Sequence, residues 1–93
     1  MNIEHDQQEN SGTFFIDEAG KKVAQMTYKL EASTMTIDHT LVDESLRGND
    51  IGAQLVNKGV KFAREKGMKI MPVCTYARKL MEKSNEYQDV LSV

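Results

Sequence analysis

The sequence predicts an α+β fold with a mixed sheet: an antiparallel three-strand meander is followed by β-α-β-α, giving the order β-β-β-α-β-α. Residues 13–42 contain three stretches of β-forming side chains joined by short polar turns. Residues 51–66 change to a helical period. A short apolar strand and a second helical stretch follow within residues 69–85. The 93-residue length predicts one domain, spanning residues 1–93.

The three strands are predicted from composition and alternation. Residues 13–17 are rich in β-formers, and Ile3 and His5 before them are compatible with a short edge strand. Residues 24–30 alternate between apolar and polar side chains, as does the stretch from Met35. Short connections between the three strands indicate an antiparallel meander. The expected inner face of the third strand comprises Met35, Ile37, His39 and Leu41.

The helical segment 51–66 carries an apolar stripe, and Gly67 is placed to end it as a C-terminal cap. Gly59 within the stripe predicts a close approach between helix and sheet, because glycine is otherwise unfavourable there. A strand at residues 69–73 should run parallel to the third strand. A second helix opens at Cys74 or Thr75, and residues 86–91 are expected to pack as a final turn or strand. We expect the helices to cover the faces of the sheet.

Composition excludes several classes of function. About 40% of residues are hydrophobic, 28% are charged and the net charge is −2, which argues against broad nucleic-acid binding. No apolar run is long enough to span a membrane, and the acidic N-terminus is unlike a signal peptide. One cysteine indicates a reducing compartment, and the widely separated histidines and cysteine predict no metal site. We therefore expect a cytoplasmic monomer with neither a nucleic-acid nor a membrane partner.

The turn Arg47-Gly48-Asn49-Asp50-Ile51-Gly52-Ala53 opens the first helix. Backbone N–H groups at a helix N-terminus lack partners within the helix and attract anions, so the turn predicts a phosphate cradle. It is not a Walker P-loop, because Ala53 and Gln54 stand where lysine and serine or threonine are required. A dinucleotide-binding fingerprint needs three glycines in the pattern G-x-G-x-x-G, and only Gly48 and Gly52 are present.

A pattern that does fit is Q/R-x-x-G-x-G/A between a strand and a helix. With Arg47 and Gly52 in place, the turn resembles the acetyl-CoA-binding motif of the GNAT superfamily of N-acetyltransferases. The β-α-β-α order of residues 34–85 is similar to the core of that superfamily. The short length, the sequence Cys74-Thr75-Tyr76-Ala77 and the ending Tyr87-Gln88-Asp89 resemble a branch of small, single-domain members.

The resemblance implies acetyl-CoA as cofactor, with its pyrophosphate on the amides of the turn and its pantetheine arm beside the end of the third strand. The second helix would form the other wall. The implied cofactor residues are Leu41, Val42, Arg47, Gly48, Asn49, Asp50, Ile51, Gly52, Ala53, Tyr76 and Lys79. Asp50 departs from the family pattern, which has glycine. Its carboxylate would either repel the pyrophosphate or point outward and cap the helix.

Cys74 and His39 are the candidate catalytic residues. Cys74 precedes a helix, whose N-terminus favours a thiolate, so it is a candidate nucleophile for the acetyl group. The alternative is that Cys74 is a small buried hydrophobe. His39 is a candidate general base, but its predicted position on the apolar face favours a hydrogen-bonded core histidine.

The resemblance therefore implies an N-acetyltransferase that moves acetyl from the coenzyme thioester to a small amine-type acceptor or a protein amine, directly or through Cys74. The chain reaches its third strand without the helices that grip the acceptor in larger relatives. An alternative is therefore a sensor or interaction module that binds acetyl-CoA or CoA with little or no transferase activity. A third alternative is a small interaction domain with a degenerate turn.

Overall fold

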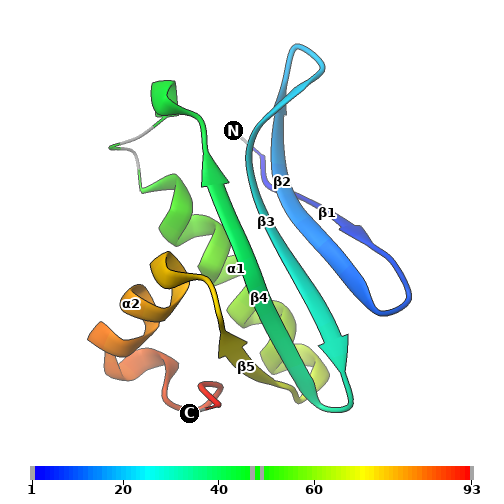
Figure 1. Ribbon diagram of the computed structural model, residues 1–93, viewed down its shortest axis with the longest axis vertical. Helices are drawn as coiled ribbons and strands as arrows, with labels where there is room; N and C mark the ends of the chain where they lie inside the picture. Colours follow the sequence, from blue (N-terminus) through cyan, green and yellow to red (C-terminus); the bar gives the residue numbers. More distant parts are fainter. Residues whose placement is uncertain (1, 47, 49, 93) are drawn as a thin grey trace.

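The computed structural model describes residues 2–46, 48 and 50–92, and it has the predicted α+β architecture. A five-stranded mixed sheet, in the order β1-β2-β3-β4-β5, lies in front of helix α1 in the view of Figure 1. The elements are β1 (Glu4–Gln7), β2 (Ser11–Glu18), β3 (Lys21–Glu31), β4 (Thr34–Val42), η1 (Glu44–Leu46), α1 (Ile51–Lys66), β5 (Lys69–Pro72), α2 (Thr75–Lys83) and η2 (Asn85–Tyr87).

The predicted meander is confirmed as β2, β3 and β4, and an edge strand precedes it. Strands β1 to β4 pair in antiparallel fashion, whereas β4 and β5 pair in parallel. The edge strand considered for Ile3 and His5 is β1, which contains His5. The crossover from β4 to β5 runs through α1, and this crossover places the N-terminus of α1 beside the end of β4 (Figure 1).

Helix α1 packs closely against the sheet, as Gly59 predicts. A Cβ atom at Gly59 would lie 2.7 Å from Met26 Cε and 3.4 Å from Met35 Cε. The backbone of Gly67 has a φ of 68° and caps the helix by donating to carbonyl oxygens of its last turn. The predicted stripe of α1 is buried, and Val60, which was not predicted, is buried with it: Ile51, Gly52, Leu55, Val56, Gly59, Val60, Phe62 and Ala63.

The expectation that helices cover the faces of the sheet is wrong for one face. Helix α2 and the tail lie alongside α1: Tyr87 Oη donates to Asn57 Oδ1 of α1 at 2.6 Å, and Arg64 of α1 makes an ion pair with Asp89 at 2.9 Å. In Figure 1 no helix lies in front of β2, β3 and β4. The uncovered face carries half-buried polar side chains, including Thr27 and Asp38, which form a hydrogen bond of 2.5 Å.

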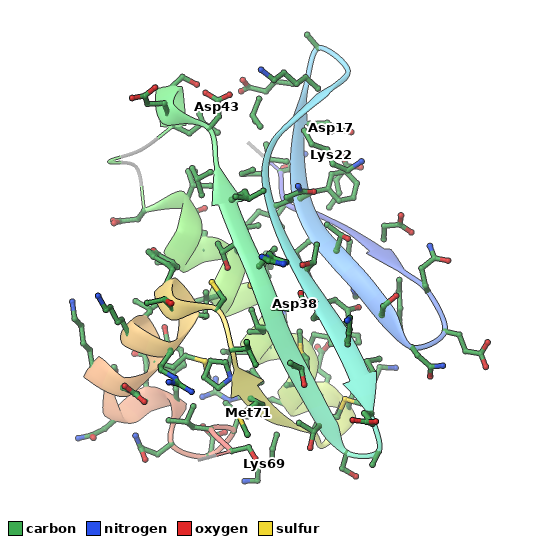
Figure 2. All side chains as sticks on the ribbon, viewed as in Figure 1. Asp17, Lys22, Asp38, Asp43, Lys69 and Met71 are labelled. Carbon is green, nitrogen blue, oxygen red and sulfur yellow. The ribbon has the colours of Figure 1, made fainter. Side chains whose placement is uncertain are left out.

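A β-bulge in β4 overturns the predicted positions of His39 and Leu41. Tyr28 of β3 pairs with Ile37, but Thr27 pairs with His39, so Asp38 is an extra residue in β4. An extra residue reverses the alternation of faces beyond it. His39 is exposed and Leu41 is 60% exposed, so neither belongs to the core. Figure 2 shows Asp38 near the middle of the uncovered face.

The tail after α2 closes the outer edge of β5. Ile70 N donates to Val90 O at 2.6 Å and Ser92 N donates to Ile70 O at 2.8 Å, which forms a parallel bridge between Ile70 and Leu91. Tyr87 and Val90 are buried. The predicted final turn or strand is therefore η2 followed by this bridge. Among the described residues, no helix is both long and apolar enough to cross a membrane.

Candidate active site

A cavity of about 370 Å³ opens where the end of β4 meets the N-termini of α1 and α2. Strand β5 pairs with β4 only as far as Ile37 and Pro72, and the two strands then separate. The amides of Val73 and Cys74 both donate to Ile37 O at 3.0 Å, which marks the point of separation. The residues that line the cavity are Thr40, Val42, Leu46, Gly48, Asp50, Ile51, Gly52 and Tyr76.

The N-terminus of α1 presents the backbone donors that the turn predicts. Gln54 N donates to Asp50 O at 3.0 Å, so the N–H groups of Ile51, Gly52 and Ala53 precede the hydrogen-bonded part of the helix. Asp50 adopts the left-handed conformation with a φ of 56°, and Gly48 has a φ of 91°. The left-handed turn therefore forms with aspartate in place of glycine.

Asp50 does not cap α1 with its side chain, so the capping alternative is wrong. Its side chain is exposed at the cavity wall. Because peptide dipoles give the helix N-terminus a partial positive charge, the carboxylate competes there with any bound anion. Arg47 and Asn49, the two remaining polar residues predicted for this cradle, lie outside the described residues.

The end of β4 directs backbone groups into the cavity. Asp43 N donates to Val23 O at 2.7 Å, and Leu41 pairs with Gln25. Along an antiparallel strand, the backbone N–H and C=O groups of successive residues point alternately toward one neighbouring strand and the other. Leu41 and Asp43 therefore bond to β3, whereas Thr40 and Val42 turn their N–H and C=O groups away from it. The backbone groups of Thr40 and Val42 point to the side of β4 along which β5 no longer pairs, so an extended ligand has room to pair with β4 there.

Tyr76, the second residue of α2, covers Gly52 at the start of α1. A Cβ atom at Gly52 would lie 2.7 Å from both Tyr76 Cζ and Tyr76 Oη. The ring is 44% exposed, so it forms part of the cavity rim. Burial, followed by the charges of Asp50 and Cys74, raises the pKa of the Tyr76 hydroxyl. Tyr76 therefore lies within electrostatic reach of both Asp50 and Cys74.

Cys74 lies between the separated strands and directly precedes α2. Its Sγ is 3.4 Å from Thr40 Oγ1, and the thiol is half-buried. Burial, the largest influence, raises the pKa of the thiol, but the nearby Thr40 hydroxyl and the backbone amides of Ala77, Tyr76 and Thr40 together lower it by more. The pKa of Cys74 is thus lower than that of an ordinary thiol, which favours the reactive thiolate.

The predicted site residues that line the cavity are Val42, Gly48, Asp50, Ile51, Gly52 and Tyr76. Leu41 projects onto the uncovered face, and Ala53, Cys74 and Lys79 are not among the lining residues. His39 is exposed and is not part of the cavity lining. Thr40 and Leu46 line the cavity but were not predicted, because the bulge that turns Thr40 inward leaves no mark in the alternating sequence. The described residues contain no cluster of three His, Cys, Asp or Glu side chains suited to a metal ion.

The family of the chain is shown by comparison with known proteins. The family model for GCN5-related N-acetyl-transferases matches residues 13–90. The chain belongs to this family. The match spans the meander, the cavity-forming turn and both helices. A comparison with curated protein sequences gave no significant match.

Solved structures of acetyltransferases share the fold. The chain is 35% identical to a Staphylococcus aureus protein assigned as a GCN5-like N-acetyltransferase, with a TM-score of 0.75, covering 98% of this chain and 89% of that one. It is 30% identical to an acetyltransferase from Bacillus cereus, with a TM-score of 0.61, covering 67% of this chain and 46% of that one. A Bacillus anthracis protein assigned as a streptothricin acetyltransferase, solved with acetyl coenzyme A, is 21% identical, with a TM-score of 0.64 and coverages of 82% and 47%. The chain therefore spans about half the length of the last two proteins.

Proposed function

We propose that the chain binds acetyl-CoA in the cavity between β4, α1 and α2 and transfers the acetyl group to an amine. The observation that carries this proposal is the convergence, in one cavity, of the α1 N-terminus and the open backbone of β4. The helix N-terminus suits a pyrophosphate, and the open backbone of β4 suits the amide-containing pantetheine arm. Family membership and the acetyl coenzyme A complex of the Bacillus anthracis protein support the choice of coenzyme.

The residues of the cavity have distinct proposed roles. The amides of Ile51, Gly52 and Ala53 donate to the pyrophosphate, and Gly48 allows the left-handed turn before them. Thr40 and Val42 of β4 pair with the pantetheine arm through their backbone. In addition, Tyr76 forms the opposite wall of the cavity. Arg47, Asn49 and Lys79 remain proposed contacts of the coenzyme phosphates on the basis of sequence alone.

Cys74 is the proposed acyl relay. Its thiolate attacks the thioester carbonyl carbon, the Sγ–C bond forms, and the C–S bond to the coenzyme breaks. The coenzyme thiolate leaves and takes a proton from water. The acceptor amine then attacks the acetyl-cysteine, forming an N–C bond; the Sγ–C bond breaks, the nitrogen loses its proton to water, and the Cys74 thiolate returns. Cys74 directly precedes α2, and the partial positive charge of this helix N-terminus suits the negative charge that develops on the carbonyl oxygen during each attack.

Coenzyme binding is tested by NMR titration with acetyl-CoA. We expect the amide signals of Ile51, Gly52 and Ala53 to shift, and those of Thr13 and Thr36 on the uncovered sheet to stay in place. Unmoved signals at the α1 N-terminus would overturn the coenzyme site. Acetyl-CoA turnover against a panel of amines then separates a transferase from a sensor, because a sensor binds the coenzyme without consuming it.

The relay is tested by mass spectrometry after brief incubation with acetyl-CoA. An acetyl adduct is expected on the native chain and is lost in Cys74→Ala. Native protein that turns over acetyl-CoA but never carries an adduct, together with a fully active Cys74→Ala variant, would establish direct transfer in place of the relay.

A further inference from the structure

Thr40 has an unusual position for a threonine in the middle of an alternating strand. The polar residues Thr36 and Asp38 precede it on β4, and strict alternation would place all three on the same face. The bulge at Asp38 instead turns Thr40 toward the helices, where it lines the cavity. Its hydroxyl there contacts the chain's single cysteine, with Cys74 Sγ and Thr40 Oγ1 at 3.4 Å.

The contact can serve both protonation states of the cysteine. In the neutral state the Cys74 thiol donates to Thr40 Oγ1. In the ionised state the threonine hydroxyl can rotate and donate to the thiolate, because a hydroxyl is both donor and acceptor. The nearby backbone amides of Thr40, Tyr76 and Ala77 also lower the pKa of the thiol, but the Cys74 side chain makes no capping hydrogen bond at the start of α2. Within the part of the chain that the structure describes, Thr40 Oγ1 is the side-chain atom that hydrogen-bonds with Cys74 Sγ.

We propose that Thr40 is a positioning residue for Cys74, holding Sγ at the separation of β4 and β5 and stabilising it as the thiolate. This inference rests on the proposed function, in which Cys74 carries the acetyl group. The bulge in β4 then has a specific role: it converts a threonine that would face outward into a hydrogen-bonding partner of the nucleophile. An uninterrupted β4 would present the side chain of His39 or Leu41 toward the helices and leave the cysteine without a side-chain donor.

Removal of the Thr40 hydroxyl should change the pKa of the Cys74 thiol. Thr40→Val keeps the branched shape of the side chain but removes the donor. Loss of a hydrogen bond to a charged group shifts the pKa of that group by about one unit. We therefore expect Thr40→Val to raise the pKa of Cys74 by about one unit, while Thr40→Ser, which keeps the hydroxyl, restores most of the native value.

The test measures the pH dependence of alkylation by iodoacetamide without any coenzyme. Because the chain has a single cysteine, the midpoint of the rate profile reports Cys74 directly. Thr36→Val is the matched control, since Thr36 is also half-buried on β4 but lies before the bulge on the uncovered face. An unchanged midpoint in Thr40→Val, or an equal shift in Thr40→Ser and Thr40→Val, would overturn the inference. Thr40→Ala provides the same comparison if valine impairs folding.

Failure of this inference is distinguishable from failure of the proposed function. If acetyl-CoA produces neither NMR shifts nor an adduct while Thr40→Val still raises the midpoint and Thr40→Ser restores it, the positioning role stands and the transferase proposal fails. If the adduct forms at the native rate in Thr40→Val and the midpoint does not move, the transferase proposal stands and the role of Thr40 is wrong.

Discussion

The ring of Tyr76 lies over the backbone of Gly52, and a methyl group on Gly52 would come within 2.7 Å of Tyr76 Cζ and Oη. The second glycine of the turn is therefore required by a side chain of α2 as well as by any phosphate bound at α1. This contact joins the two helices at the mouth of the cavity. It also gives Gly52 a structural role that can be measured without the coenzyme.

Gly52→Ala should destabilise the native chain through this contact. Overpacking typically costs about 1–3 kcal/mol, and we expect the lower end because the Tyr76 ring is exposed enough to move. In a Tyr76→Ala background the same change should be neutral or stabilising, since alanine favours a helix over glycine by about 1 kcal/mol. Urea unfolding of the four variants measures the coupling. Equal effects of Gly52→Ala in both backgrounds would refute the steric explanation.

Asp50→Gly should strengthen binding of acetyl-CoA. Glycine accepts the φ of 56° without strain, and the change removes a carboxylate from the wall of the proposed pyrophosphate site. A gain of about 1 kcal/mol corresponds to a Kd lowered roughly fivefold, measured by calorimetry. Asp50→Asn is the matched control, because it removes the charge and keeps a side chain that tolerates the left-handed conformation. Identical Kd values for the native chain and both variants would show that the carboxylate does not reach the ligand.

Protonation of His5 should weaken the attachment of β1. His5 Nε2 lies 2.5 Å from Tyr28 Oη, and its ring stacks on Phe14 with centroids 4.0 Å apart. Burial lowers the pKa of His5 below 6.5, although Asp6 partly opposes this effect. The unfolded chain then binds the proton more readily, so the contribution of His5 to stability is present above about pH 6.5 and is lost as the pH falls through the lower folded pKa.

The measurement is urea unfolding at about pH 7.5 and pH 5.5, on either side of the ordinary histidine pKa. The native chain should lose more stability across this interval than His5→Gln, whose side chain does not titrate. His39→Gln is a suitable control, because His39 is exposed. A native chain and His5→Gln variant with the same pH dependence would contradict the prediction.

Tyr87→Phe should loosen the tail without unfolding it. The change removes the 2.6 Å hydrogen bond to Asn57 Oδ1 but keeps the buried ring, so we expect a loss of about 1 kcal/mol. Tyr87→Ala removes the ring as well and should cost about 3–5 kcal/mol. Chemical denaturation gives both values, and hydrogen exchange at Ile70 and Ser92 shows whether the loss is local to the tail. Equal losses in the two variants would mean that the ring itself contributes little.

The sequence predicts most of the fold because its apolar residues recur with clear helical and strand periods. The stripe of α1, the glycine close to the sheet and the cap at Gly67 all follow from residue type and spacing, and all are observed. The bulge in β4 is different. Apolar and polar residues alternate without interruption through Asp38. The change of face that exposes His39 and turns Thr40 into the cavity therefore depends on pairing with β3. Pairing with another strand is a tertiary property that a single strand's pattern does not contain.

The same limit applies to the candidate site. Gly48, Asp50, Ile51 and Gly52 could be predicted because a turn that opens a helix has local sequence requirements. The contacts of Tyr76 with Gly52 and of Cys74 with Thr40 join residues far apart along the chain. They arise from the separation of β4 and β5, whose position depends on where their pairing ends.

The bridge between Ile70 and Leu91 has a consequence for how the chain behaves at high concentration. An open sheet edge is a template for another chain, and edge-to-edge pairing is a common route to aggregation. At β5 the chain's own tail already occupies the hydrogen-bonding groups of Ile70, while the opposite edge is the short strand β1, which carries Glu4 and Asp6. The tail therefore protects the edge of β5 from pairing with another chain. A chain cut short before Val90 would expose β5 to intermolecular strand addition.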